Sequence, residues 1–250
     1  MLIDVIKKFN ELPKTLQNNE VLYYYEILSK KRLSLFAKRV FDIVVSLLLL
    51  VIISPILAII AILIKTDSSG RVVFKQKRVT RYGKTFYIYK FRTMYEGSEK
   101  GSNVTLKNDS RITHIGMTLR KYRLDELLQL FNILKGDMSF VGTRPEVEKY
   151  VNSYSDEMMA TLLLPAGVTS LASIYYKDEA DLLDNIDDMD KMYVKEILPA
   201  KMYYNLKGIK NFSFWVDIKI MFMTVLAMLG KEYTGDYVPD KKKEMEGTAV

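Results

Sequence analysis

The chain has 250 residues, 49% of them hydrophobic and 27% charged, which excludes a disordered chain and a polytopic membrane bundle. It has no cysteine and a single histidine, His114, so a disulfide framework, a cysteine-ligated zinc site, a thiol nucleophile and a Ser-His-Asp triad are not expected. The formal charge is +7, and residues 65–100 hold ten Lys or Arg against three Asp or Glu, which indicates either a solvated basic face or an anionic partner.

Residues 1–30 predict one or two amphipathic helices. The segment Val40–Ile64 follows, with 21 apolar residues among 25. As one helix it would be about 37 Å long, enough to span a bilayer. Ser54 and Pro55 lie inside it, and proline removes a backbone hydrogen bond, so we expect them to break or kink the helix into two shorter legs.

Basic residues flank both ends of this segment, which bears on its orientation. Positive residues favour the cytoplasmic side, and a helix that enters the membrane and returns satisfies that preference at both ends. A kinked helix that spans the bilayer is the alternative. The flanking residues are Lys30, Lys31, Arg32, Lys38 and Arg39 before the segment and Lys65, Arg71, Lys75, Lys77 and Arg78 after it.

Downstream of Lys65, Arg71–Phe74 and the alternation in Lys84–Phe91 predict a β-hairpin that turns at Tyr82-Gly83. A helix with apolar residues at helical spacing is expected over Leu124–Leu134, ended by Gly136. The other expected elements are a polar loop at Glu96–Asn108, a short helix capped by Asp109 or Ser110 and ending at Arg120, a solvated acidic stretch at Asp178–Asp190, a core or interfacial helix at Phe212–Leu229 and a frayed tail from Lys241.

The adjacent carboxylates Asp125 and Glu126 are the first candidate for chemistry. They fall in the first turn of the expected helix, where acidic residues are often merely favourable end charges. Their surroundings favour a functional role, since a carboxylate among cations stays ionised, as a nucleophile or Mg²⁺ ligand must. The polar neighbours in sequence are Arg120, Lys121, Arg123, Gln129 and Asn132.

Two basic motifs are further candidates. The paired cations of Lys90–Met94 end the hairpin and can bind phosphate oxygens; the alternative is that they simply lie at the edge of a sheet. The loop Gly136–Glu146 holds Arg144 beside Pro145 and can present its guanidinium to a diphosphate, although structural loops share this composition. No Walker A, GxGxxG or helix-turn-helix signature is present.

Taken together and in this order, the motifs resemble the bacterial sugar transferase family of monotopic phosphoglycosyl transferases. The resemblance covers roughly residues 36–230. It is carried by Lys38-Arg39 with Asp42, Ser54-Pro55, Phe74–Val79 with Gly83, Lys90–Met94, Leu124–Leu127, Gly136–Ser139, Val141–Glu146, Gly167–Thr169 and Trp215–Lys219.

The resemblance implies an α+β, predominantly helical fold. It implies a helical N-terminal extension (1–35), a re-entrant membrane helix hairpin (36–66), a compact cytosolic catalytic domain (67–235) with a small β-hairpin and interfacial helices, and a flexible tail (236–250). It also implies the short form of the family, without the multi-span N-terminal domain of larger members, located in the bacterial inner membrane with the catalytic domain facing the cytoplasm.

The implied activity is transfer of a sugar 1-phosphate from a UDP-sugar to polyprenyl (undecaprenyl) phosphate, with Mg²⁺ and with release of UMP. This is the initiating step of surface glycans such as exopolysaccharide, capsule or O-antigen. The resemblance makes Asp125 the nucleophile, through an aspartyl phospho-sugar, and gives the metal to Glu126 together with Asp125. It places Lys90, Arg92, Arg120, Arg144, Pro145 and Glu146 near the phosphates or nucleotide, and it makes Lys38 and Arg39 anchors at the membrane interface.

Two positions depart from the family pattern, and two other functions stay open. Thr143 stands where the family usually has proline, and Ser170 where many members have glycine. The main alternative is a non-catalytic, membrane-anchored basic module of a glycan-assembly complex. A nucleic-acid binder explains the charge but not the acidic pair, so the expected partners are the two substrates and membrane lipid, without nucleic acid, and a homo-oligomer is compatible with the sequence.

Overall fold

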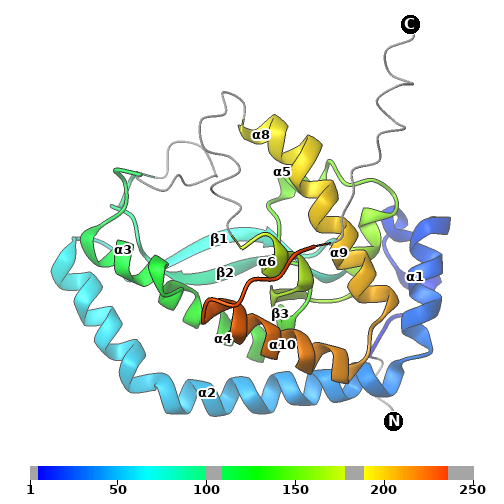
Figure 1. The fold of residues 1–250 in the computed structure, drawn as a ribbon, viewed down its shortest axis with the longest axis horizontal. Helices are drawn as coiled ribbons and strands as arrows, with labels where there is room; N and C mark the ends of the chain where they lie inside the picture. Colours follow the sequence, from blue (N-terminus) through cyan, green and yellow to red (C-terminus); the bar gives the residue numbers. More distant parts are fainter. Residues whose placement is uncertain (1–4, 99–108, 178–188, 236–250) are drawn as a thin grey trace, which may run out of the picture.

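The computed structural model describes residues 5–98, 109–177 and 189–235, and within them the fold is mostly helical with two small sheets (Figure 1). The expected tail and most of the polar loop and of the acidic stretch lie outside the described residues. The helices are α1 (Asn19–Ser29), α2 (Arg32–Asp67), α3 (His114–Lys121), α4 (Gln129–Lys135), α5 (Glu148–Val151), α6 (Leu171–Tyr175), α8 (Met189–Met192), α9 (Leu198–Lys210) and α10 (Phe214–Met228). The strands are β1 (Val73–Val79), β2 (Thr85–Phe91), β3 (Met138–Val141) and β4 (Ala166–Thr169).

The N-terminal region is helical, as its apolar spacing predicts. The side chain of Asn18 caps α1 by accepting a hydrogen bond of 2.8 Å from the backbone N–H of Val21. The buried face of α1 enters a core shared with residues 160–164 and with α9, and Tyr24 donates a hydrogen bond of 2.5 Å to Glu157. Residues 5–31 are therefore packed against the rest of the protein.

The helix α2 buries three polar residues in its N-terminal half and exposes many of its apolar residues. Lys38, Asp42 and Ser46 are buried at helical spacing, while Leu48, Ile52 and many other apolar side chains are exposed. This inverts the pattern of a soluble helix and is typical of a helix surrounded by lipid. Among the described residues, α2 is the one helix long and apolar enough to cross a membrane.

Of the two expectations for Ser54 and Pro55, the break is wrong, because α2 continues through both residues. Figure 1 shows that α2 is bent, with one limb along the base of the molecule and the other rising toward β1. Pro55 has no N–H for the carbonyl of Val51, and the Ser54 hydroxyl donates to that carbonyl at 2.8 Å instead. The side chain thus replaces the backbone bond that proline removes, and the helix persists.

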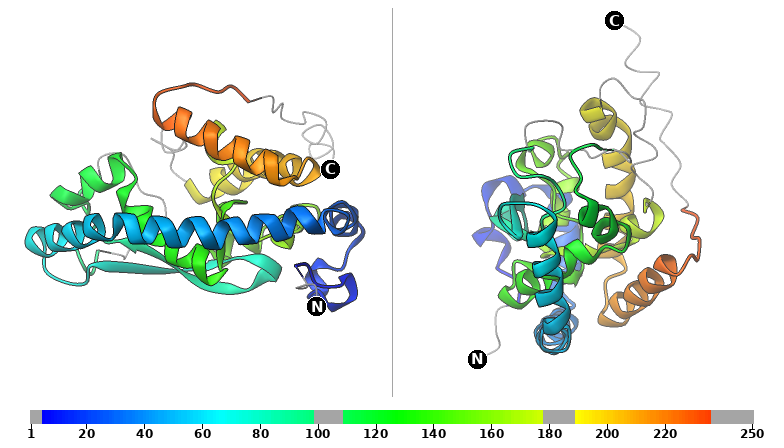
Figure 2. Two further views of the ribbon diagram at one scale, coloured as in Figure 1. Left: turned by 90° about the horizontal axis from the view of Figure 1, so that it is seen from below. Right: turned by 90° about the vertical axis from the view of Figure 1, so that its left-hand side faces the viewer.

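Both limbs of α2 pack on the same globular part of the chain. In the first limb, Leu50 lies in a core with Phe86 and Ile88 of β2 and with Ile133 of α4. In the second limb, Ile60 and Ile64 lie in a core with Phe91 of β2, Leu119 of α3 and Leu128. Seen from below, α2 crosses the molecule between α10 on one side and the β1–β2 hairpin on the other (Figure 2).

The expected hairpin is present as β1 and β2, antiparallel and in a register that pairs Phe74 with Lys90. Its turn includes Tyr82 at φ 60° and Gly83 at φ 71°, both left-handed. A second sheet, which the sequence did not predict, pairs β3 and β4 in parallel. It brings the loop after Val141 beside Gly167, where a Cβ would lie 2.1 Å from the backbone nitrogen of Gly142. The close approach requires glycine there.

The remaining helices follow the expectations with one correction. The cap of α3 is Thr113, whose hydroxyl accepts from the N–H of Gly116, rather than Asp109 or Ser110. Asp109 instead pairs with Arg111 at 2.6 Å, so its carboxylate is not available for the helix end. The helix α10 begins at the cap Ser213 and leaves Trp215 76% exposed, together with Phe222, Met228 and Leu229. Such an apolar face fits an interfacial helix better than a core helix.

Candidate active site

The acidic pair lies at a change of direction in the backbone. The helix α3 ends at Lys121, and Arg123 takes the left-handed conformation at φ 53°, which is uncommon for a residue other than glycine. A 3₁₀ helix, Leu124–Leu128, starts directly after it and runs into α4. Asp125 and Glu126 therefore fall in the first turn of a helical segment, as the sequence predicts, but in a 3₁₀ turn rather than in an α-helix.

The hairpin supplies the first cation of the site. Lys90 lies on the face of β2 opposite Tyr87 and Tyr89, because successive side chains alternate between the faces of a strand. The side chain of Asn132 fixes this strand to α4, accepting from the N–H of Tyr89 at 3.0 Å and donating to the carbonyl of Tyr87 at 2.8 Å. This contact holds Lys90 beside the start of α4.

Glu126 is held between two cations. Its Oε1 accepts from Lys90 Nζ at 2.7 Å and from Arg144 Nη2 at 2.6 Å, and Oε2 lies 3.4 Å from Arg144 Nη1. Burial alone would raise the pKa of Glu126, but Arg144 and Lys90 hold that pKa well below its ordinary value. Burial also lowers the pKa of Lys90, partly offset by Glu126. Glu126 is thus a fixed anion that orients both cations.

Asp125 is in a different state from its neighbour. It is 9% exposed and forms no ion pair within 4 Å with any residue that the structure describes. Burial raises its pKa, and the adjacent Glu126 raises it further, whereas Lys90 and Arg120 lower it. A buried carboxylate that faces cations without being bound by them keeps its oxygens available to an incoming group.

Two side chains near Asp125 have unused hydrogen-bonding capacity. The Nη1 atom of Arg120 is buried and has no hydrogen-bond partner among the described residues. Gln129 is 1% exposed, and neither its Oε1 nor its Nε2 has such a partner within the same residues. Buried polar groups are normally paired, so unpaired groups at this place indicate a site that a polar ligand completes.

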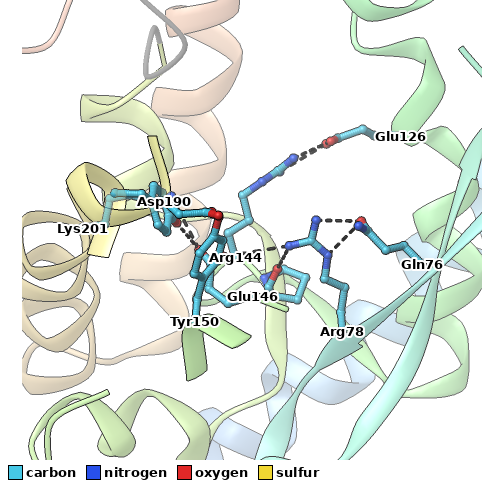
Figure 3. A network of polar contacts seen from close by, with 10 residues as sticks. Gln76, Arg78, Glu126, Arg144, Glu146, Tyr150, Asp190 and Lys201 are labelled. Atoms are coloured by element: carbon cyan, nitrogen blue, oxygen red, sulfur yellow. Dashed lines mark hydrogen bonds and ion pairs between the residues drawn. The ribbon is translucent and has the colours of Figure 1, made fainter. Parts of the chain in front are cut away.

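A second polar cluster surrounds Glu146, on the other side of Arg144 (Figure 3). Glu146 is buried and accepts from the hydroxyl of Tyr193 at 2.5 Å, with Lys201 at 3.6 Å and Arg78 at 3.9 Å. Arg78 also donates to the carbonyl of Pro145 at 3.1 Å and to Gln76 at 2.7 Å. This cluster ties the loop that carries Arg144 to β1 and α9.

The structure brings together some of the residues expected at the phosphates and separates others. Lys90, Arg120 and Arg144 lie around the acidic pair. Arg92 does not join them: it is buried and donates to the carbonyls of Ser68 and Ser69 at 2.7 and 2.5 Å, near the end of α2. Pro145 and Glu146 belong to the second cluster, where their oxygens accept from protein donors.

The expectation that Lys38 and Arg39 anchor the protein at the membrane interface is wrong. Lys38 is 6% exposed, pairs with Asp217 of α10 at 2.6 Å and donates to the carbonyl of Val141 at 2.7 Å. Arg39 donates to the carbonyls of Ile133 and Leu134 at the end of α4. A basic pair beside an apolar segment resembles a lipid anchor in sequence, but both side chains are used by helix ends and a carboxylate within the protein.

Several residues of the two clusters could not be assigned a role from sequence. Arg78 lies inside the motif Phe74–Val79, but nothing in that motif indicates that its partner is Glu146. Tyr193 and Lys201 lie about fifty residues after Glu146 in the chain, and no motif surrounds them. Gln129 was noted only as a neighbour on the face of Asp125. Its lack of a partner is visible only in three dimensions.

Comparisons with known proteins give a consistent result. A family model described as bacterial sugar transferase matches residues 33–231. A UDP-N-acetylgalactosamine-undecaprenyl-phosphate N-acetylgalactosaminephosphotransferase of Aeromonas hydrophila is 36% identical over 198 residues, which are 78% of this chain and 44% of that protein. A UDP-glucose:undecaprenyl-phosphate glucose-1-phosphate transferase of Klebsiella pneumoniae is 39% identical over 194 residues, 75% of this chain and 39% of that protein.

The alignment with a third relative covers more of this chain. The undecaprenyl-phosphate galactose phosphotransferase of Salmonella typhimurium is 32% identical over an alignment of 253 residues, which covers 92% of this chain and 50% of that protein. The chain therefore spans half or less of the length of these three relatives. The three names differ in the sugar and agree on undecaprenyl phosphate.

Proposed function

The chain belongs to the bacterial sugar transferase family, and from that premise we propose that it transfers a sugar 1-phosphate from a UDP-sugar to undecaprenyl phosphate and releases UMP. The observation that carries the proposal is the state of the acidic pair. Asp125 is buried and forms no ion pair with any described residue, and it lies beside Glu126, which holds Lys90 and Arg144 in place. This arrangement presents a nucleophile to an anionic substrate and neutralises the charge that the substrate brings.

The proposed reaction has two steps at one phosphorus atom. An oxygen of Asp125 attacks the β-phosphorus of the UDP-sugar, and the bond from that phosphorus to the bridging oxygen breaks, so that UMP leaves with the bridging oxygen. An oxygen of undecaprenyl phosphate then attacks the same phosphorus, and the aspartyl–phosphorus bond breaks to restore the carboxylate. The product is undecaprenyl diphosphate carrying the sugar. Arg120, Arg144 and Lys90 bind phosphate oxygens in both steps.

The donor set of the site fits Mg²⁺ in one limited way. No group of three or more His, Asp or Glu side chains that would enclose a metal occurs among the described residues. Mg²⁺ often binds through one or two carboxylates and completes its coordination with substrate phosphates and water. Glu126 is engaged by two cations, so Asp125 would be the main protein ligand, with Glu126 beside it. When bound, the ion would offset the negative charge of the diphosphate.

The arrangement of α2 supports membrane association and, as a further proposal, re-entry. Lys38 in the first limb binds Asp217, and beyond the second limb Ser68 and Ser69 are bound by Arg92. Both ends of the helix are therefore attached to the same globular part, which favours a helix that enters and leaves on one side. We propose that residues 36–66 form this re-entrant segment and that residues 67–235 face the cytoplasm at the inner membrane.

The topology is tested by labelling, since the chain has no cysteine of its own. Single cysteines replace Asn19 and Ser98, which lie before and after α2, and an impermeant thiol reagent is added to intact cells. The proposal requires that neither cysteine reacts until the cells are permeabilised. Labelling of either one in intact cells contradicts re-entry and favours a kinked span.

The activity is tested by measuring UMP release by the purified chain from a panel of UDP-sugars, with undecaprenyl phosphate and Mg²⁺. We expect release from one or a few members of the panel, and the reactive member identifies the sugar. A well-folded, membrane-inserted sample that releases no UMP from any member contradicts the proposal and supports the alternative of a non-catalytic basic module.

A further inference from the structure

Gln129 is the residue near the acidic pair whose burial lacks a structural explanation. It is 1% exposed, and both polar atoms of its carboxamide lack a hydrogen-bond partner among the residues that the structure describes. Leaving a buried donor or acceptor unpaired is costly to folding. A methionine or leucine would fill the same space without that cost. The glutamine therefore reduces the stability of the free protein.

Asn132, one turn further along α4, shows what a structural amide looks like in the same surroundings. It is equally buried, but its oxygen accepts from the N–H of Tyr89 and its nitrogen donates to the carbonyl of Tyr87. The two amides lie three residues apart on neighbouring turns of one helix. One is fully used by the fold and the other is not.

Helix geometry directs Gln129 toward the acidic pair. It follows Glu126 by three residues, the spacing that places two side chains on one face of a 3₁₀ helix, and Glu126 is adjacent to Asp125. Side chains in helices lean toward the N-terminus and cover the preceding turn. A long side chain at position 129 therefore leans toward the turn that holds the acidic pair. Arg120, whose buried Nη1 has no hydrogen-bond partner among the described residues, lies close enough to Asp125 for its charge to lower the pKa of that carboxylate.

We propose that Gln129 is a substrate-contacting residue of this site, whose Nε2 donates a hydrogen bond to a phosphoryl oxygen of the diphosphate when that group reaches Asp125. The inference rests on the proposed function. The ligand supplies an acceptor for Nε2 that no described residue supplies, so the part of the folding cost that comes from this donor is recovered in the complex. In this proposal Gln129 and Arg120 are both hydrogen-bond donors to the diphosphate.

The test compares three variants of the 250-residue chain in detergent or nanodiscs. They are Gln129→Met, Gln129→Glu and, as the matched contrast, Asn132→Leu. Thermal unfolding is measured without ligand. The rate of UMP release from the reactive UDP-sugar is measured without undecaprenyl phosphate, so that only the first step occurs.

For Gln129→Met we expect a melting temperature equal to or above that of the wild type and a rate of UMP release lower by about 10- to 100-fold, the loss of a hydrogen bond to a charged group. Asn132→Leu should melt at a lower temperature. Gln129→Glu adds an anion and should be slower than the wild type at neutral pH. It should recover relative to the wild type as the pH falls, because a protonated glutamic acid again has a donor.

Three outcomes would overturn the inference. A Gln129→Met protein that releases UMP as fast as the wild type shows that the amide does not contact substrate. A Gln129→Met protein that is destabilised like Asn132→Leu, or that fails to fold, shows that the amide is structural. If the wild type itself releases no UMP from the panel, the proposed function fails and this inference fails with it. In the first two outcomes the wild type is active, so they contradict the role of Gln129 without contradicting the proposed function.

Discussion

The two buried acidic clusters on either side of Arg144 have similar composition and opposite hydrogen-bonding states. Around Glu146, the carboxylate is matched by Tyr193, Lys201 and Arg78. Around the acidic pair, Glu126 is bound by Lys90 and Arg144, but Asp125 forms no ion pair with any described residue, and Arg120 and Gln129 have buried atoms without described partners. A cluster whose polar groups all have partners in the protein stabilises the fold, whereas a cluster with groups left without partners can bind a polar ligand.

Hydrogen-bond partners distinguish the two clusters, whereas charge and burial alone do not. Both clusters contain a buried carboxylate and partly buried arginines, so composition and burial do not distinguish them. Arg144 lies in a loop that connects the two clusters (Figure 3). Arg78 of the Glu146 cluster binds the carbonyl of Pro145 in this loop, and the side chain of Arg144 itself binds Glu126. We therefore assign support of the loop to the first cluster and chemistry to the second.

The largest expected effect is that of Asp125→Asn. The amide keeps the shape of the side chain but is not a nucleophile, so UMP release should fall by at least about 10³-fold. Burial raises the pKa of Asp125, which means that the folded chain binds this proton more tightly than the unfolded chain does. The ionised side chain therefore lowers stability at neutral pH, and the variant should melt at the same temperature as the wild type or higher. Substantial activity in a folded sample refutes the assignment of the nucleophile.

Chelation should have an effect of similar size but a reversible one. Asp125 is a carboxylate without an ion-pair partner among the described residues, and the diphosphate adds further oxygen ligands, so a hard cation is expected to join them. EDTA should stop UMP release, and Mg²⁺ in excess should restore it. The melting temperature without substrate should change little, because no closed metal cage occurs in the described chain. Full activity in EDTA contradicts the prediction.

Glu146→Ala should act on stability rather than on the chemical step. It leaves Arg78 and Lys201 buried without their carboxylate, and breaking a buried pair in this way costs about 3–5 kcal/mol. Denaturant unfolding measures this loss, and activity is normalised to folded protein. A variant that keeps wild-type stability and loses activity would reverse the comparison and return Glu146 to the substrate site.

The smallest expected effect is a displacement on the pH axis. Turnover needs Asp125 ionised, so kcat/KM should fall on the acid side with an apparent pKa above 3.8. Glu126 has its pKa held well below its ordinary value and stays charged through this range. In Glu126→Gln, removal of the neighbouring charge should move the acid limb to lower pH while kcat falls. A limb at the same pH in both proteins contradicts the coupling.

The sequence predicted the elements that depend on local pattern. The hairpin, the helical segment with Asp125 and Glu126, and α10 are set by alternation, caps and spacing, and all three are present. The parallel pairing of β3 with β4 was not predicted, because strands of four residues carry little periodicity. Wrong assignments concern long side chains. Lys38, Arg39 and Arg92 carry a charge several bonds from the backbone, and sequence does not say which of several acceptors that charge reaches.

The bend in α2 shows the same limit from the other side. Proline at position 55 predicts a break or a kink, and the sequence alone does not decide between them. The serine before it donates a hydrogen bond to the carbonyl of Val51, which has no backbone partner at Pro55, so the helix continues. The pair of residues, and not proline alone, decides the outcome.

The inverted helix α2 has a practical consequence for anyone who wants a water-soluble form of this protein. Deleting an apolar anchor usually frees an intact domain, but here Leu50, Ile60 and Ile64 fill the interior beside the hairpin, and Lys38 holds Asp217. A truncated chain would lose one wall of its own core. Solubility would have to come from redesigning the outer face of the helix, at exposed positions such as Leu48 and Ile52, while its inner face is kept.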